Sequence, residues 1–230
     1  MNAVTPTFAA VYAKDPAARH MYPTEFVIRT FLGRYPRLQL DQSRYRGAAV
    51  LDLGCGDGRN LPLLHNLGMT ITAVEVDEAT CNTARVRAAA AGIPCAVHAG
   101  INAHLPLPSA SFDYVLACHS CYYVTDGETF ADNAREIGRV MRADGTFVFS
   151  LPTLDNYILR GADARPDNHF VIRNDPYGLR NGTLFRAFAT EDEVRRALAP
   201  TFEDVRLGLC RDDFYGIEQN YWIGAARRSD

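Results

Sequence analysis

The 230-residue chain has no apolar run that approaches the length of about 18 residues needed for a membrane-spanning helix. Residues 1–16 lack a basic segment followed by an apolar core, which a secretory signal would require. Neither an internal repeat nor a low-complexity segment is present. We therefore expect a globular, cytoplasmic protein with no membrane partner.

A large excess of either charge is also absent, because 24 basic and 27 acidic side chains leave a net charge of −3. This balance disfavours nucleic acid as the main partner, since phosphate backbones bind strongly basic surfaces. The six cysteines need not form disulfides, because a chain of this length can bury a sufficient core without them. The composition is that of one ordinary globular domain, residues 1–230.

Short β-branched segments alternate with longer helical patterns through the middle of the chain. This alternation predicts an α/β fold with a doubly wound, mostly parallel sheet. The predicted strands are residues 49–53, 70–76, 95–98, 112–118 and 146–151, and the predicted helices are residues 60–67, 78–91 and 126–141. A helix at residues 190–198 then precedes two strands, residues 202–209 and 221–226, which we expect to pair antiparallel at the sheet edge.

Two regions break this alternation. Residues 1–46 are rich in aromatics and prolines, and their apolar spacing at residues 26–31 predicts a helical cap over a pocket. Residues 152–189 are rich in Asn, Asp, Gly and Pro, and a connection of this length is usually functional, so we expect a substrate lid. Residues 47–151 would then form the ligand-binding core, and residues 190–230 would complete the sheet.

The strongest local signal is Asp52-Leu53-Gly54-Cys55-Gly56-Asp57-Gly58, which follows a predicted strand and precedes a helix. Glycines allow positive φ and let a ligand approach the backbone, and the following helix supplies free N–H groups. Glu75 ends the next strand, where a carboxylate can accept hydrogen bonds from ribose hydroxyls. The spacing differs from the dinucleotide fingerprint G-x-G-x-x-G, and Asp52 would repel a pyrophosphate. The loop therefore favours a positively charged nucleoside.

On these residues the sequence resembles the class I S-adenosylmethionine-dependent methyltransferases. The resemblance extends from Val50 to Leu151 and includes Leu105-Pro106-Leu107-Pro108 before the fourth strand. It implies a Rossmann-like seven-stranded sheet with one antiparallel edge strand, an N-terminal helical cap and an insert after strand five. It also implies S-adenosylmethionine as the methyl donor and S-adenosylhomocysteine as the product.

The resemblance further implies which residues contact the cofactor. Asp52 is expected near its amino-acid portion and Glu75 at its ribose. Asn102 is expected near adenine, because Ile101 stands where the family often has an acidic residue. The predicted cofactor-binding residues are Asp52, Gly54, Cys55, Gly56, Asp57, Glu75, Val76, Asn102, Ala103 and Cys118.

His119 follows the fourth strand at the carboxyl edge of the sheet, where open α/β folds bind ligands. A neutral imidazole there can take a proton from a substrate hydroxyl, although a purely structural histidine is an equal alternative. Tyr22 and Tyr122 are the other catalytic candidates. Of Tyr122 and Tyr123, we expect one to line the pocket and the other to pack in the core.

Several weaker signals favour structural roles. Cys118 and Cys121 form a lone C-x-x-C, and without further ligands it predicts no metal site. Asn174-Asp175-Pro176-Tyr177 looks like a tetrad of nucleic-acid amino-methyltransferases, but its place after the fifth strand favours a turn. Tyr12 and Arg19 in the cap are candidate ligands of the cofactor carboxylate or the substrate, and His169 in the insert is a weaker base candidate.

The function we expect is methyl transfer to a small-molecule acceptor, by O- or N-methylation in a biosynthetic pathway. The aromatic cap and the long insert favour an enclosed pocket. The alternatives are a nucleic-acid methyltransferase, an NAD-dependent oxidoreductase and a non-catalytic S-adenosylmethionine-binding module. The expected assembly is a monomer or a homodimer.

Overall fold

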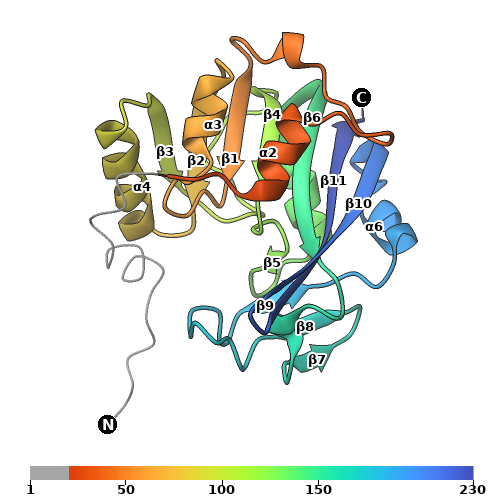
Figure 1. The fold of residues 1–230 in the computed structure, drawn as a ribbon. Helices are drawn as coiled ribbons and strands as arrows, with labels where there is room; N and C mark the ends of the chain where they lie inside the picture. The colour runs from red at the N-terminus through yellow and green to blue at the C-terminus, as the bar shows by residue number, and fades with distance from the viewer. Residues whose placement is uncertain (1–20, 230) are drawn as a thin grey trace.

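The computed structural model describes residues 21–229, so Tyr12 and Arg19 lie outside the described residues. Seven strands in this range form one sheet in the order β10-β11-β6-β4-β1-β2-β3 (Figure 1). They are β1 (Ala49–Leu53), β2 (Thr70–Glu75), β3 (Cys95–Ala99), β4 (Phe112–Ala117), β6 (Met141–Pro152), β10 (Phe202–Phe214) and β11 (Ile217–Arg228). The order reverses direction at β1, which places a ligand crevice at the carboxyl ends of β1 and β4.

The predicted seven-stranded, mostly parallel sheet is confirmed. Neighbouring strands from β3 through β6 are parallel, and β11 runs antiparallel to both β6 and β10. The antiparallel strand therefore lies one place in from the edge, and β10 forms the edge itself.

Helices cover both faces of the sheet, because successive side chains of a strand point to opposite faces. Val50 packs with the helices of one face, whereas Leu51 and Leu53 pack with those of the other. The first face carries α2 (Glu25–Leu32), α3 (Leu61–Asn66) and α4 (Glu78–Ala90), and the second carries α5 (Phe130–Val140) and α6 (Glu191–Leu198). The helix expected over residues 26–31 is confirmed as α2, which buries Phe26, Val27, Thr30 and Phe31.

Helix starts follow the capping side chains. Helix α5 begins at Phe130 rather than at residue 126, because Thr129 and Asp132 form a reciprocal capping box immediately before it. At α6 the Thr190 hydroxyl accepts a hydrogen bond from the Glu193 N–H, as the sequence spacing predicted. Strand β6 begins five residues before the predicted residue 146, because its first residues continue directly from α5.

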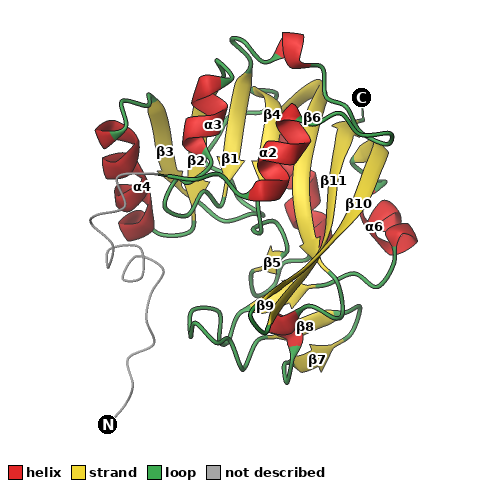
Figure 2. Cartoon of the chain, in the orientation of Figure 1, coloured by secondary structure: helices red, strands yellow, loops and turns green. Residues whose placement is uncertain are grey.

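The segment after β6 pairs with β5, from the loop after β4, in a second, smaller sheet (Figure 2). Its antiparallel strands are β5 (Tyr123–Val124), β7 (Asp163–Arg165), β8 (His169–Val171) and β9 (Leu184–Arg186). Short 3₁₀ helices lie at Gln42–Arg44 and Tyr157–Leu159. Phe185 and Phe188 are fully buried in the same apolar core as the main sheet. The insert is therefore held against the carboxyl edge of that sheet.

No helix within residues 21–229 is both long and apolar enough to cross a membrane.

Candidate functional site

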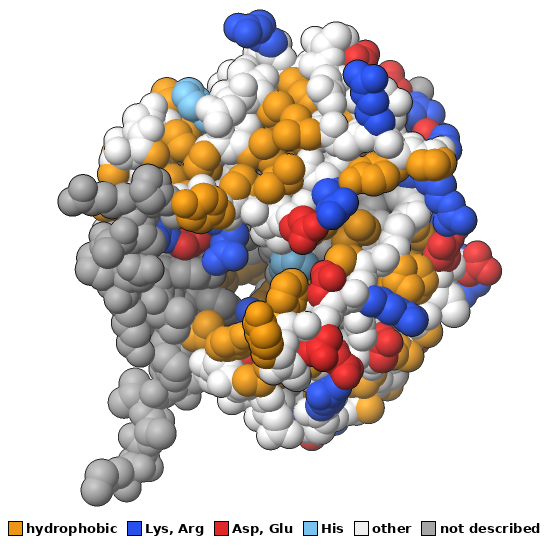
Figure 3. Space-filling view, viewed as in Figure 1, with side chains coloured by type: hydrophobic (Ala, Val, Ile, Leu, Met, Phe, Trp, Pro, Cys, Tyr) orange, Lys and Arg blue, Asp and Glu red, His pale blue; other side chains and the backbone are white. Residues whose placement is uncertain are grey.

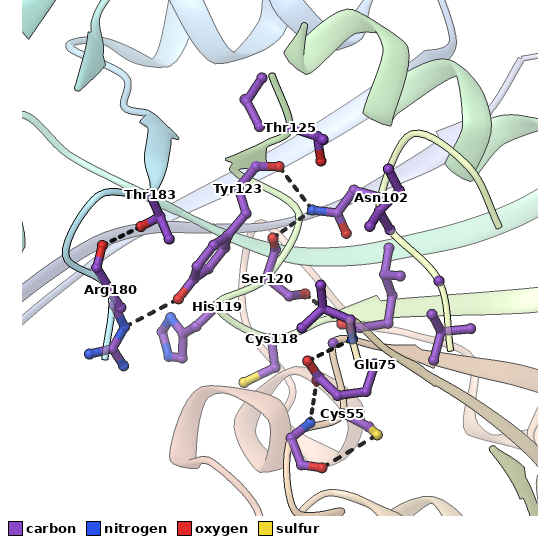
Figure 4. Close-up of a pocket in the computed structure, with 18 of the residues that line it drawn as sticks. Cys55, Glu75, Asn102, Cys118, His119, Ser120, Tyr123, Thr125, Arg180 and Thr183 are labelled. Carbon is purple, nitrogen blue, oxygen red and sulfur yellow. Dashed lines mark hydrogen bonds between the residues drawn. The ribbon is translucent and has the colours of Figure 1, made fainter. Parts of the chain in front are cut away.

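A cavity of about 510 Å³ lies where the main sheet meets the insert. Figure 3 shows this face of the molecule hollowed, with acidic and basic side chains around the hollow. We distinguish a glycine-loop half, represented by Gly54, Gly56, Glu75 and Asn102, and a His119 half, represented by Cys118, His119, Tyr123 and Arg180. All eight residues line the same cavity (Figure 4).

The loop after β1 requires glycine for two separate reasons. Gly54, Gly56 and Gly58 have φ values of +68°, +57° and +86°, which side chains rarely adopt. A Cβ atom on Gly54 would also lie 2.3 Å from the Cβ of Ser120, in the loop after β4. The loop thus packs closely against the next part of the site while exposing its backbone to the cavity.

Glu75 fixes the end of β2 to this loop. Its Oε2 accepts a hydrogen bond from the Gly56 N–H at 2.9 Å, and its Oε1 accepts one from the Val76 N–H at 2.9 Å (Figure 4). Burial raises the pKa of Glu75, although these two N–H groups oppose the shift. A carboxylate oxygen can accept more than one hydrogen bond, so both oxygens remain able to accept from a ligand hydroxyl in the cavity.

Asp52 lies in β1 just before the loop and is not among the residues that line the cavity. Its side chain is fully buried, and neither carboxylate oxygen has a hydrogen-bond partner within residues 21–229. Burial, together with the charges of Glu75 and Asp57, raises the pKa of Asp52 to about 7. An unpartnered buried carboxylate favours a cationic group nearby.

The remaining predicted residues of this half separate into wall and core positions. Asn102 donates its amide hydrogens to the backbone carbonyls of Ser120 and Tyr123, at 2.9 and 3.1 Å, so its own carbonyl oxygen remains for a ligand. Asp57 forms an ion pair with Arg87 of α4. Ala103 is buried and is not among the lining residues, whereas Cys55, Asp57, Val76 and Ile101 are.

His119 begins the other half with an unusual backbone conformation, φ +57°. Its backbone N–H donates to the Ser150 Oγ at 2.9 Å, and the same oxygen lies 3.0 Å from the ring Nδ1. The ring packs against Tyr221 with a centroid separation of 4.3 Å. Burial, together with the charges of Arg180 and Arg59, lowers the pKa of His119 to about 4. The imidazole is therefore neutral at physiological pH.

Tyr123, rather than the predicted Tyr122, lies on the cavity wall. Tyr122 is 2% exposed and packs edge-on against Phe185 in the core. The Tyr123 hydroxyl accepts a hydrogen bond from the Arg180 Nε at 3.2 Å (Figure 4). The sequence had left open which tyrosine of this pair reaches the pocket, and the pairing of β5 with β9 decides it.

Sequence reasoning missed Arg180. Its guanidinium lines the cavity and forms an ion pair with Asp175 at 3.3 Å. Asp175 also accepts hydrogen bonds from the backbone N–H groups of Tyr177, Leu179 and Arg180, so it organises the turn that carries the arginine. The Asp-Pro turn that the sequence indicated is therefore present. Asp175 was the signal in the sequence that could have pointed to a cationic partner such as Arg180.

The N-terminal segment contributes Thr24 instead of Tyr22. Tyr22 is 75% exposed and is not among the lining residues, whereas Thr24 lines the cavity. The Cys118 thiol donates to the Thr24 hydroxyl at 3.3 Å. His169 bonds to the Pro166 carbonyl and is not among the lining residues. All six cysteines are free thiols, and residues 21–229 contain no cluster of three or more potential metal ligands.

The glycine-loop half fits S-adenosylmethionine. The positive-φ loop offers open backbone, and Glu75 offers acceptors for the ribose hydroxyls. The unpartnered Asp52 carboxylate complements the positive charge of a sulfonium nucleoside rather than a pyrophosphate.

Comparison with known proteins also indicates a methyltransferase. A family model described as a methyltransferase domain matches residues 51–149. A ubiquinone biosynthesis O-methyltransferase from Caulobacter sp. strain K31 is 28% identical over 181 residues, which cover 78% of this chain and 69% of that protein. A probable S-adenosylmethionine-dependent methyltransferase from Mycolicibacterium smegmatis is 34% identical over 109 residues, 47% of this chain and 40% of that protein.

Solved structures show the same fold. A methyltransferase from Methanosarcina mazei superimposes with a TM-score of 0.64 at 16% identity, over 85% of this chain and 98% of that chain. The 1,6-didemethyltoxoflavin N1-methyltransferase of Burkholderia thailandensis, whose structure contains 1,6-didemethyltoxoflavin and S-adenosylhomocysteine, superimposes with a TM-score of 0.58 at 24% identity, over 80% and 72% of the two chains.

Proposed function

We propose that the chain is a class I S-adenosylmethionine-dependent methyltransferase that methylates an oxygen or nitrogen of a small-molecule acceptor. When bound, S-adenosylmethionine supplies a methyl group that its sulfonium makes electrophilic. The protein then has to align the acceptor with that methyl and exclude bulk water.

In this proposal the glycine-loop half holds the cofactor. Glu75 accepts hydrogen bonds from the ribose, and the Asn102 carbonyl oxygen accepts from the adenine amino group while Ile101 packs on the ring. Asp52 supports the positive charge of the cofactor from behind the loop. These roles use side chains whose acceptor atoms are free or only partly used by the protein.

The observation that carries the small-molecule proposal is that the insert forms part of the cavity wall. Arg180, Thr183 and Leu184 line it opposite Gly54 and Glu75. Its volume of about 510 Å³ lies within the ordinary range of small-ligand sites, roughly 300–1,000 Å³. A polymer would need an open groove instead.

The names of similar proteins support the same acceptor class. Two relatives are named ubiquinone biosynthesis O-methyltransferase, and one structural neighbour is a 1,6-didemethyltoxoflavin N1-methyltransferase solved with 1,6-didemethyltoxoflavin bound. Both O- and N-methylation occur among them.

Two measurements test the proposal. Calorimetry should show S-adenosylhomocysteine binding in the micromolar range, about −8 kcal/mol, and no binding of NAD. Transfer of radiolabelled methyl groups should then be detected with a panel of small hydroxylated and aminated ring compounds, and not with total RNA or DNA. Labelling of a nucleic acid and of none of the small compounds would overturn the proposed acceptor class.

A further inference from the structure

The hydrogen bonds of Ser150 determine which ring nitrogen of His119 carries the proton. Ser150 is fully buried in β6, and its Oγ already accepts from the His119 backbone N–H. Within residues 21–229 its hydroxyl has one further partner, the His119 Nδ1. A buried hydroxyl without an acceptor costs about 1–3 kcal/mol. The Ser150 hydroxyl therefore donates to Nδ1.

This assignment leaves the hydrogen on Nε2. A neutral imidazole has one donor nitrogen and one acceptor nitrogen, and here Nδ1 is the acceptor. Nε2 has no hydrogen-bond partner within residues 21–229 and is not among the buried unpartnered atoms there. His119 lines this cavity and a second one beside Phe26 and Tyr221, and we infer that Nε2 faces the first, where Arg180 also lies. An N–H group at this position donates a hydrogen bond and cannot accept a proton.

The rest of the His119 half also lacks a base. Burial raises the pKa of the Cys118 thiol to about 12. Burial likewise raises the pKa of Tyr123, whose hydroxyl oxygen already accepts from Arg180. Arg180 is a cation, and its Nη2 has no partner within residues 21–229. This half thus presents hydrogen-bond donors to the acceptor and nothing that removes its proton.

The donors also discriminate between acceptor atoms. An amine nitrogen has a single lone pair, which must attack the methyl group. An oxyanion has three lone pairs, so two remain for hydrogen bonds while the third attacks. Donors around the reacting atom therefore favour an oxygen that arrives without its proton.

We propose that Ser150 holds His119 as the Nε2–H tautomer, and that His119 and Arg180 together bind an acceptor oxygen that is already an oxyanion, the phenolate or enolate of an acidic hydroxyl. This deepens the proposed function and rests on it. An oxygen lone pair forms the new C–O bond as the C–S bond breaks and its electron pair passes to sulfur. The oxyanion and sulfonium charges cancel, so no proton has to be removed.

The tautomer is tested in the protein alone. Long-range ¹H–¹⁵N correlation spectra of histidine-labelled protein, with His119 assigned by the loss of its signals in His119→Gln, should show an unprotonated Nδ1 and a protonated Nε2 from pH 6 to 8. Ser150→Ala should let the two tautomers mix. A protonated Nδ1 in the wild-type protein would overturn the proposal, even if Ser150→Ala fails to fold.

The acceptor class is tested with 4-nitrocatechol, which ionises near neutral pH and changes colour, against catechol, which stays uncharged. With S-adenosylhomocysteine present at pH 7.5, the nitrocatecholate should bind about tenfold more tightly than catechol. His119→Ala and Arg180→Gln should each weaken it about five- to tenfold. His119→Gln should recover most of the affinity, because the glutamine amide places a donor near the Nε2 position.

Arg173→Gln is the matched control, because Arg173 lies in the same insert but forms an exposed ion pair with Asp163. It should leave nitrocatecholate binding unchanged. Equal binding of the two catechols, or no binding of nitrocatecholate, would overturn the oxyanion assignment. Binding of S-adenosylhomocysteine itself is measured separately, so failure of the methyltransferase function remains distinguishable from failure of this inference.

Discussion

The two halves of the cavity differ in how they are built. The glycine-loop half consists of backbone, a carboxylate and an amide, and its parts lie at the ends of the consecutive strands β1, β2 and β3. The His119 half is aromatic and cationic, and it joins the loop after β4 to an insert that starts beyond β6. Acceptors thus face one end of the ligand site and donors face the other. In such an arrangement, the half that binds the cofactor can stay constant among methyltransferases while the other half determines which acceptor binds.

The largest effect on the glycine-loop half is expected from Gly56→Val. A branched side chain at a φ of +57° strains the loop and adds bulk to the wall of the proposed cofactor site. We expect the dissociation constant of S-adenosylhomocysteine, measured by calorimetry, to rise at least about 100-fold, which corresponds to about 2.7 kcal/mol.

The control for this change is Gly92→Val. Gly92 also has positive φ, at +68°, but nothing lies within 4 Å of an added Cβ, and it is outside the cavity. It should lose stability and keep its affinity. Wild-type affinity in a folded Gly56→Val protein would remove the loop from the cofactor site.

Asp52→Asn tests the buried charge in the glycine-loop half. The folded-state pKa of Asp52 is about 7 and its ordinary value is 3.8, so the unfolded chain ionises first as pH rises. Ionisation of Asp52 therefore destabilises the fold progressively between about pH 4 and pH 7. The asparagine variant should gain roughly 2–4 kcal/mol in free energy of unfolding, relative to wild type, between pH 4 and pH 8.

Urea unfolding of both proteins without cofactor measures this difference. A difference in unfolding free energy that does not change with pH would show that Asp52 is not a strained carboxylate. The same variant should bind S-adenosylmethionine, which carries the sulfonium charge, more weakly, so that the cost of Asp52 in stability is measured separately from its gain in binding.

Glu75→Ala should raise the dissociation constant of S-adenosylhomocysteine about tenfold or more, because each charge-assisted hydrogen bond contributes about 1.5–3 kcal/mol. Glu75→Gln should lose less, since its amide oxygen can still accept from the Gly56 N–H. Calorimetry with an analogue that lacks both ribose hydroxyls completes the test. If Glu75→Ala weakens the binding of that analogue as much as it weakens the binding of S-adenosylhomocysteine, the carboxylate does not hold the ribose.

The smallest effect on cofactor binding is expected from Tyr123→Phe, because this change lies in the His119 half. Its hydroxyl bonds to Arg180 and not to the glycine-loop half. The affinity for S-adenosylhomocysteine should stay within about twofold, because a neutral hydrogen bond contributes only about 0.5–1.5 kcal/mol and this one lies away from the cofactor. Methyl transfer should fall by a larger factor. A tenfold loss of cofactor affinity would show that the two halves are not separate.

Much of the fold was predictable because its signals are local. Strand β1 and helix α4 follow from β-branched and capped segments whose bounds the structure reproduces within one residue. The insert was less predictable, because β5 and β9 are very short strands that are stable only when paired across a long connection. The adjacent residues Tyr122 and Tyr123 illustrate this difficulty, because Tyr122 packs in the core whereas Tyr123 lies on the cavity wall.

Contiguous residues and regular alternation encode the glycine loop, the carboxylate at Glu75 and the positions of the parallel strands along the chain. The order of those strands in the sheet, the approach of Arg180 to His119 and the contact of Ser150 with the His119 ring depend on the folded chain. Those contacts connect segments about 30 or more residues apart, and the direction of a hydrogen bond depends on partners that no local pattern reveals. The proton on His119 is therefore a property of the folded molecule.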